Sequence, residues 1–188
     1  MSFGTTWSEE LVAEWLVLKG YFVLTNVPYA THERGGVVEA DAVGFKIFDD
    51  GSTEILHVEV GSYCESAKKI VEKVKEKFYK YEAEKRLKNY LKYYLDPVAE
   101  KARYRRIFVS VAPISDEVKN KLQELNIEVL TLDEAVDEVF KAFENWTNHL
   151  KTMNLRKPDT GVTPPQHLRA LQMLFYLRKL RKLNTIML

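Results

Sequence analysis

Two stretches in the first third of the chain alternate apolar and polar residues with the two-residue period of a β-strand. They cover residues 37–48 and 54–60, and are separated by the acidic, glycine-containing stretch 49–52. Asp, Gly and Ser favour tight turns, because glycine takes a positive φ without steric cost and aspartate bonds to nearby backbone. The pattern therefore predicts a β-hairpin.

Acidic residues lie among the apolar side chains of this hairpin. Glu39 and Asp41 are on the first predicted strand, and Glu59 is on the second. Burying two carboxylates among apolar side chains is costly unless a cation lies between them. Mg²⁺ is commonly held by one or two carboxylates together with substrate phosphates. We therefore expect Asp41 and Glu59 to lie side by side as a metal site; the alternative is that both acids lie at solvated strand ends.

The residues before the hairpin predict a helix followed by a strand. The helix begins near Thr6 or Ser8, carries apolar residues on one face and ends near Lys19. The predicted strand covers residues 21–27, and residues 28–36 form a polar connection to the hairpin.

Helical periodicity resumes after the hairpin. Apolar residues at three- and four-residue spacings predict one long amphipathic helix between Lys68 and Pro97. The elements that follow alternate, with strands over 106–112 and 127–130 and helices over 117–125 and 132–145. This order requires parallel pairing through a crossover connection, which predicts an α/β sandwich.

Composition limits the class of protein. The chain has 188 residues, 46% of them hydrophobic, and a formal net charge of +1, so it can bury a proper core. Its single cysteine, Cys64, excludes an internal disulfide framework and a multi-cysteine zinc site. The sequence contains neither a signal-peptide pattern nor an apolar run of membrane-spanning length. We therefore expect a cytoplasmic protein.

The near-neutral total hides two basic regions. Residues 68–106 contain 14 Lys and Arg against 6 Asp and Glu, and residues 145–188 contain 8 against 1. Such regions are suited to binding nucleic-acid phosphates without sequence preference. In the first region, however, glutamates interleave with the lysines, so many charges can instead pair on a solvated helix face.

The hairpin pattern, E-x-D, then a turn, then apolar-Val-Glu-Val, resembles the core of the PD-(D/E)xK nuclease superfamily. The surrounding layout is most similar to the Holliday-junction-resolvase-like and Mrr-like branches. The resemblance implies a restriction-endonuclease-like three-layer sandwich, in which helices flank a central mixed β-sheet. It also implies a nuclease that hydrolyses phosphodiester bonds, in DNA, with Mg or Mn as cofactor.

The resemblance also implies roles for individual residues. Asp41 corresponds to the family's aspartate and Glu59 to the acid of the (D/E)xK element, while the backbone carbonyl of Val60 would contact the metal. Glu9, in the first helix, matches a glutamate that helps to complete the metal site, and Glu39 is a second possible helper. The alternative for Glu9 is that it only complements the helix dipole.

The family's lysine is absent from its expected position, where this chain has Gly61. We expect Lys68 or Lys69, in the opening turns of the next helix, to reach back and act as the catalytic lysine. Otherwise the chain is a catalytically inactive nuclease-like module that binds nucleic acid or a protein partner. A third possibility is a purely structural homodimer.

Several residues are expected to contact DNA. The basic ones are Arg34, Lys73, Lys77 and Lys80, which are suited to phosphate. His32 can contact phosphate or lie solvated in its loop. Tyrosines of the Lys-rich helix can stack on unpaired bases or serve as packing residues: Tyr79, Tyr81, Tyr90, Tyr93 and Tyr94.

The C-terminal part is predicted to be an extension of a single domain. We assign residues 1–147 to the nuclease-like domain, 148–165 to a Pro/Gly/Thr-containing linker, and 166–188 to a basic amphipathic helix. This helix can exchange with a partner subunit, clamp nucleic-acid backbone or lie on a membrane surface. Its large apolar residues favour packing on the body or on a second subunit, and we expect a homodimer with no membrane partner.

Overall fold

The computed structural model of the chain describes residues 6–33, 35–95, 98–153 and 168–176. Arg34, most of the expected linker and residues 177–188 of the expected C-terminal helix therefore lie outside the described residues.

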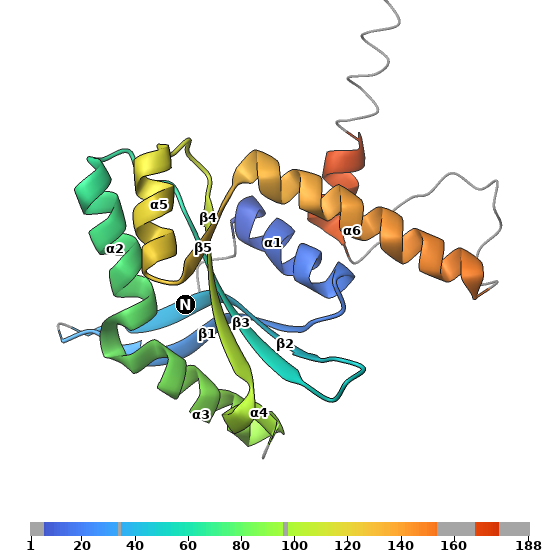
Figure 1. Cartoon of the computed structure of the whole chain (residues 1–188), viewed down its shortest axis with the longest axis horizontal. Helices are drawn as coiled ribbons and strands as arrows, with labels where there is room; N and C mark the ends of the chain where they lie inside the picture. The colour runs from blue at the N-terminus through green and yellow to red at the C-terminus, as the bar shows by residue number, and fades with distance from the viewer. Residues whose placement is uncertain (1–5, 34, 96–97, 154–167, 177–188) are drawn as a thin grey trace, which may run out of the picture.

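A five-stranded mixed sheet forms the centre of the molecule (Figure 1). Its strands lie in chain order: β1 (Phe22–Thr31), β2 (Val37–Ile47), β3 (Thr53–Gly61), β4 (Arg103–Ser110) and β5 (Ile127–Thr131). The first three are antiparallel, whereas β3, β4 and β5 run parallel. The predicted hairpin and the predicted parallel crossover are both present.

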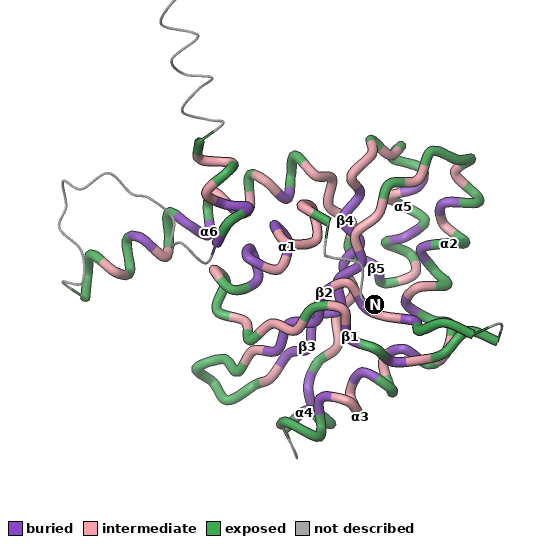
Figure 2. Tube along the Cα trace, turned by 180° about the vertical axis from the view of Figure 1, so that it is seen from behind, coloured by how far each residue is buried: buried purple, intermediate pink, exposed green. Residues whose placement is uncertain are grey.

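Helices cover both faces of the sheet. On one face lie α1 (Trp7–Leu18), α6 (Leu132–Thr152) and a short helix at 169–176; on the other lie α2 (Ala67–Tyr79), α3 (Ala83–Leu95) and α5 (Asp116–Glu124). Adjacent residues of the strands supply the two cores, as when Leu56 faces α1 and Ile55 faces α3. Figure 2 shows buried residues along the central strands and on the inner sides of the helices. The chain is a three-layer α/β sandwich, as predicted.

Helix starts follow the sequence closely. Thr6 caps α1 in a capping box with Glu9, and Ser115 caps α5 by accepting a hydrogen bond from the Val118 backbone amide. None of the described helices is long and apolar enough to cross a bilayer.

The first strand is longer than predicted. We expected it to end at residue 27, but β1 continues through Pro28 and the buried Tyr29 to Thr31. Proline lacks a backbone N–H, yet β1 is an edge strand, and an edge tolerates that loss. The polar connection is correspondingly shorter.

The predicted long amphipathic helix is wrong, because the structure breaks it in two. Between α2 and α3 lies a turn of 3₁₀-helix, η1 (Lys80–Glu82), in which Tyr81 and Glu82 have φ values of 61° and 53°. Such left-handed conformations interrupt an α-helix. After α3 the chain adds one short helix, α4 (Val98–Lys101), before β4.

The boundary between body and linker is also wrong. Helix α6 extends to Thr152, so the expected linker start at residue 148 and the domain end at residue 147 fall inside a helix. Residues 168–176 then return to the body. Leu168 and Leu171 join the core between α1 and α6. This part of the expected C-terminal helix therefore packs on the body of the same chain, which was one of the alternatives for it.

A buried carboxylate holds this segment in place. Glu14 of α1 is only 5% exposed. Its two oxygens accept hydrogen bonds from the backbone amides of Ala170 (3.0 Å) and Leu171 (2.7 Å). These amides belong to the first turn of the 169–176 helix, where backbone donors lack partners within the helix.

We expect Glu14→Ala to destabilise the protein by about 2–4 kcal/mol, because it leaves two buried amides without acceptors. Urea unfolding measures the change, and limited proteolysis should show earlier cleavage near residues 168–176. The control is Glu10→Ala, on the same helix, which removes a solvent-accessible ion pair with Arg169 (3.6 Å) and should cost at most about 1 kcal/mol. Equal losses in the two variants would contradict the capping role.

Candidate active site

The hairpin brings the two predicted acids together. Ala42 of β2 lies opposite Val58 of β3, so Asp41 and Glu59 form the next position along the antiparallel register. Here the Val60 backbone N–H donates to Asp41 Oδ2 (2.7 Å). The acceptor for the Val60 amide is thus a side-chain oxygen of β2 and not a backbone carbonyl. The two acids lie beside each other at the position where β2 and β3 stop pairing.

Glu59 is held by a buried hydrogen-bonded chain. Its side chain is 2% exposed, and Oε1 lies 2.7 Å from Nε2 of His57, which is completely buried. Nδ1 of His57 lies 2.7 Å from the Tyr104 hydroxyl. A neutral imidazole satisfies both contacts when Nε2–H donates to Glu59 and Nδ1 accepts from Tyr104. His57 therefore fixes the orientation of the carboxylate.

Sequence reasoning gave His57 no role. The available signal was its position two residues before Glu59 on the same strand, which places both side chains on one face.

The lysine next to the acids comes from α2. Nζ of Lys77 lies 2.8 Å from Oε2 of Glu59. Lys68 and Lys69, which we expected to reach back to the acids, are exposed residues in the first turn of α2, whereas the lysine that contacts Glu59 is near the other end of this helix.

The space beside Gly61 is narrow. A Cβ atom added at Gly61 would lie 3.2 Å from the ring of Tyr63 and 3.3 Å from that of Phe108. These two rings are stacked, with centroids 5.9 Å apart. A longer side chain at residue 61 would have to displace the Tyr63 ring, whereas Lys77 approaches from the helix layer.

The charges of the site are unbalanced. Burial raises the pKa of Asp41 to about 7, with further contributions from the charges of Glu59 and Glu9, against the opposing effects of Lys77 and the Val60 amide. Burial tends to lower the pKa of Lys77, but the charges of Glu59 and Asp41 outweigh it and raise that pKa. Lys77 is therefore a permanent cation between two acids, and its single charge leaves them undercompensated.

The two helper glutamates differ. Glu9 accepts a hydrogen bond from the Thr6 backbone amide (2.8 Å) as part of the α1 capping box. The charge of Glu9 also raises the pKa of Asp41. Glu9 therefore caps α1 and also lies near the two acids. Glu39 lies opposite Pro28 of the edge strand, two residues from Asp41.

The donor set fits an open metal site rather than a closed one. Among the described residues, no cluster of three or more His, Cys, Asp or Glu side chains is arranged to hold a metal. Asp41, Glu59 and the Val60 carbonyl nevertheless supply oxygen donors. Oε2 of Glu59 is buried, and its partner is the Lys77 ammonium at 2.8 Å. These features suit Mg²⁺ or Mn²⁺, which can take their remaining ligands from water and phosphate.

A basic cavity adjoins the acids. It has a volume of about 190 Å³, and its cationic wall consists of Lys73, Lys77 and Lys80. Three of the four basic residues expected to contact DNA therefore line one hollow, and the fourth, Arg34, lies outside the described residues. Larger hollows of about 440 and 450 Å³ lie elsewhere, and Arg106 lines both.

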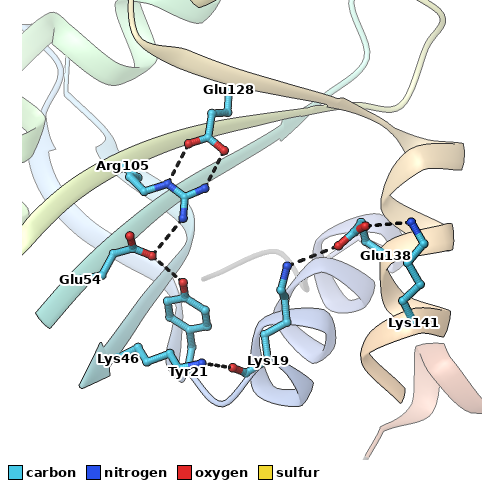
Figure 3. Close-up of polar contacts among 8 residues, drawn as sticks. All are labelled: Lys19, Tyr21, Lys46, Glu54, Arg105, Glu128, Glu138 and Lys141. Atoms are coloured by element: carbon cyan, nitrogen blue, oxygen red, sulfur yellow. Dashed lines mark hydrogen bonds and ion pairs between the residues drawn. The ribbon is translucent and has the colours of Figure 1, made fainter. Parts of the chain in front are cut away.

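A second buried glutamate lies at the opposite end of β3 (Figure 3). Glu54 is 3% exposed, and its Oε1 accepts from the Tyr21 hydroxyl (2.5 Å) and from Arg105 (3.1 Å). Arg105 in turn binds both oxygens of Glu128, at 2.7 and 2.6 Å. Burial and the hydrogen bond to Glu54 raise the pKa of Tyr21. Both carboxylates of this network bind the guanidinium of Arg105, an arrangement that is typical of a structural role.

Comparisons with known proteins identify no function for the site. No protein-family model matches the sequence, and no curated protein matches it. The chain is similar in structure to a crystal structure of a protein of unknown function, AF1548, with 14% identity and a TM-score of 0.45. The similarity covers 72% of this chain and 65% of that one.

The raised Asp41 pKa predicts a pH-dependent stability difference. With a folded pKa of about 7 against a usual 3.8, the folded state binds the proton more tightly. The stabilisation is fully present below pH 4 and is lost as the pH rises through 7. Asp41→Asn should therefore match the wild type near pH 4 and exceed it by up to roughly 4 kcal/mol at pH 8.

Urea unfolding across this pH range measures the difference. Asp137→Asn, at an exposed position of α6, is the matched control and should show a constant offset from the wild type. An offset for Asp41→Asn that did not change with pH would contradict the raised pKa.

Proposed function

We propose that this protein is a divalent-metal-dependent nuclease that hydrolyses phosphodiester bonds in DNA, with Asp41, Glu59 and Lys77 at its active site. The observation that carries the proposal is the Lys77–Glu59 ion pair of 2.8 Å. It supplies, from α2, the cation that the resembled motif would place at residue 61. An acid pair next to a lysine and a basic cavity is suited to a phosphate group.

The residues of the site have different roles in this proposal. Asp41, Glu59 and the Val60 carbonyl would hold the metal. A bound Mg²⁺ or Mn²⁺ supplies Lewis-acid stabilisation of charge on the phosphate. The His57–Tyr104 pair orients Glu59, as partners behind a ligating carboxylate do in metal sites.

Lys77 acts as an electrostatic group. Its raised pKa keeps it protonated throughout the physiological range, so it can stabilise negative charge on the phosphate but cannot serve as a base. Asp41, with a pKa of about 7, loses its proton near neutrality. Activity should therefore rise with pH through this region, because the ionised carboxylate is the form that binds metal.

A second candidate is a nuclease-like module that binds nucleic acid or a protein partner without cutting. Glu59 favours it, because both of its oxygens already have partners in His57 and Lys77. Under this alternative the basic cavity still binds phosphate, but metal adds nothing. The expected cytoplasmic location and the expected homodimer belong with either candidate. Residues 168–176 of the C-terminal helix pack on the body, and residues 177–188 lie outside the described residues.

Cleavage of labelled DNA tests the proposal. With Mg²⁺ or Mn²⁺, the wild type should cut single-stranded, duplex or branched DNA. Asp41→Asn and Lys77→Met should each lower the rate by about 100-fold or more, the order expected for loss of one transition-state contact. Asp137→Asn and Lys75→Met, at exposed positions of α6 and α2, control for the loss of charge. Undiminished cutting by Asp41→Asn would overturn the assignment.

Thermal unfolding separates the two candidates without relying on activity. A metal that binds only the folded state raises the Tm. We expect Mn²⁺ to raise the Tm of the wild type more at pH 8 than at pH 6, since Asp41 must lose its proton, and not to raise that of Asp41→Asn. No rise at either pH in the wild type would favour the non-cutting module.

A further inference from the structure

We propose that the cavity beside Lys77 is a subsite for one unpaired nucleobase, so that the substrate is single-stranded DNA or a single-stranded segment. This inference rests on the proposed function for its phosphate position, and it adds the class of substrate. It is carried by the aromatic walls of the cavity, by its size and by the break between α2 and α3.

The walls of the cavity are aromatic as well as basic. Tyr29, Tyr63, Tyr81 and His32 line it together with the lysines. The rings are held in place by other contacts: Tyr29 donates its hydroxyl hydrogen to the Lys77 carbonyl (2.9 Å), and Tyr63 is stacked on Phe108. Fixed rings make a stacking surface at little entropic cost, and every base presents a π-face.

The position of the Lys77 ammonium determines where the phosphate lies relative to the base. Lys77 belongs both to the acid pair and to the cavity wall. A nucleotide whose phosphate contacts Lys77 therefore has its base at the mouth of the cavity. Lys73 and Lys80 lie over the Tyr63 and Tyr81 rings, 5.5 Å and 5.3 Å from their centroids, and pair with Glu65 and Glu76. A strand that passes the cavity can exchange these two ion pairs for contacts between the lysines and its neighbouring phosphates.

Size limits the occupant. At about 190 Å³, the cavity is smaller than the roughly 300–1,000 Å³ pockets that enclose whole small-molecule ligands. It has room for one planar group. A base inside a duplex is stacked and paired, so it cannot enter without leaving the helix, whereas a base in a single strand can enter freely.

The helix break provides one of the walls. Tyr81 and Glu82 both adopt left-handed backbone conformations, although neither is glycine. Such backbone conformations are strained in residues with a Cβ, and such strain gathers at ligand sites. Tyr81 meets His32 edge to face, with centroids 5.9 Å apart, and its hydroxyl lies 3.3 Å from His32 Nδ1. The contact thus links η1 to the connection between β1 and β2 beside the cavity.

Fluorescence anisotropy tests this subsite in EDTA, without cleavage. The probes are a fluorescein-labelled 12-nucleotide oligothymidine, the same strand with abasic residues, and a hairpin duplex. The wild type should bind the oligothymidine about 5- to 100-fold more tightly than the abasic strand, the range that one or two stacking contacts provide. It should also prefer the oligothymidine to the duplex.

Substitutions of Tyr81 test whether its ring is responsible for the preference for bases. Tyr81→Asn tolerates the left-handed backbone and should abolish the preference for bases, while Tyr81→Phe should retain it. Tyr176→Ala, at a position 62% exposed on the 169–176 helix on the other face of the sheet, is the control and should bind like the wild type. Equal affinity for oligothymidine and the abasic strand, or a base preference that survives Tyr81→Asn, would overturn the subsite.

The two proposals fail separately. Base-dependent binding that requires Tyr81, without cleavage under any metal condition, would support the subsite and overturn the nuclease. Metal-dependent cleavage that requires Asp41, with no base preference in binding, would overturn the subsite and leave the nuclease.

Discussion

The ion pair between Lys77 and Glu59 connects the helix layer to the sheet. Glu59 is buried on β3, and a buried carboxylate without a partner is costly. Helix α2 can supply the ammonium only if it packs closely, and Phe78, the next residue, does so with its ring centroid 4.7 Å from that of His57. Packing, the buried hydrogen-bonded chain and the position of the cation are therefore parts of one arrangement. A shift of α2 would disturb all three.

The two ends of β3 show how similar residues take different roles. Glu54 and Glu59 are both buried glutamates on the same strand, five residues apart. Glu54 is matched by the planar guanidinium of Arg105, which also binds Glu128, and every partner has a defined hydrogen bond. Glu59 is paired with the Lys77 ammonium, and burial together with the charge of Glu59 raises the pKa of Asp41. Both ends thus hold one cation for two carboxylates, but the side chain of Glu128 is 52% exposed, whereas burial raises the pKa of Asp41.

Much of this arrangement follows from local sequence. Alternation and turn residues fix the hairpin, and its register alone places Asp41 beside Glu59. The sequence also shows that residue 61 lacks a lysine. The substitute could not be identified in advance, because it depends on how α2 lies over the sheet, and Lys77 is near the end of that helix rather than its start. The break at Tyr81 was equally hidden, since neither glycine nor proline marks it. Long-range packing decided both features.

The contact between Glu14 and residues 170–171 has a consequence for how the chain folds during synthesis. The core between α1 and α6 includes Leu168 and Leu171, so the apolar face of the first helix remains partly uncovered until those residues have left the ribosome. The sheet and α2 can form earlier, because their contacts come from residues already made. The first helix of the protein is thus among the last described elements to be enclosed.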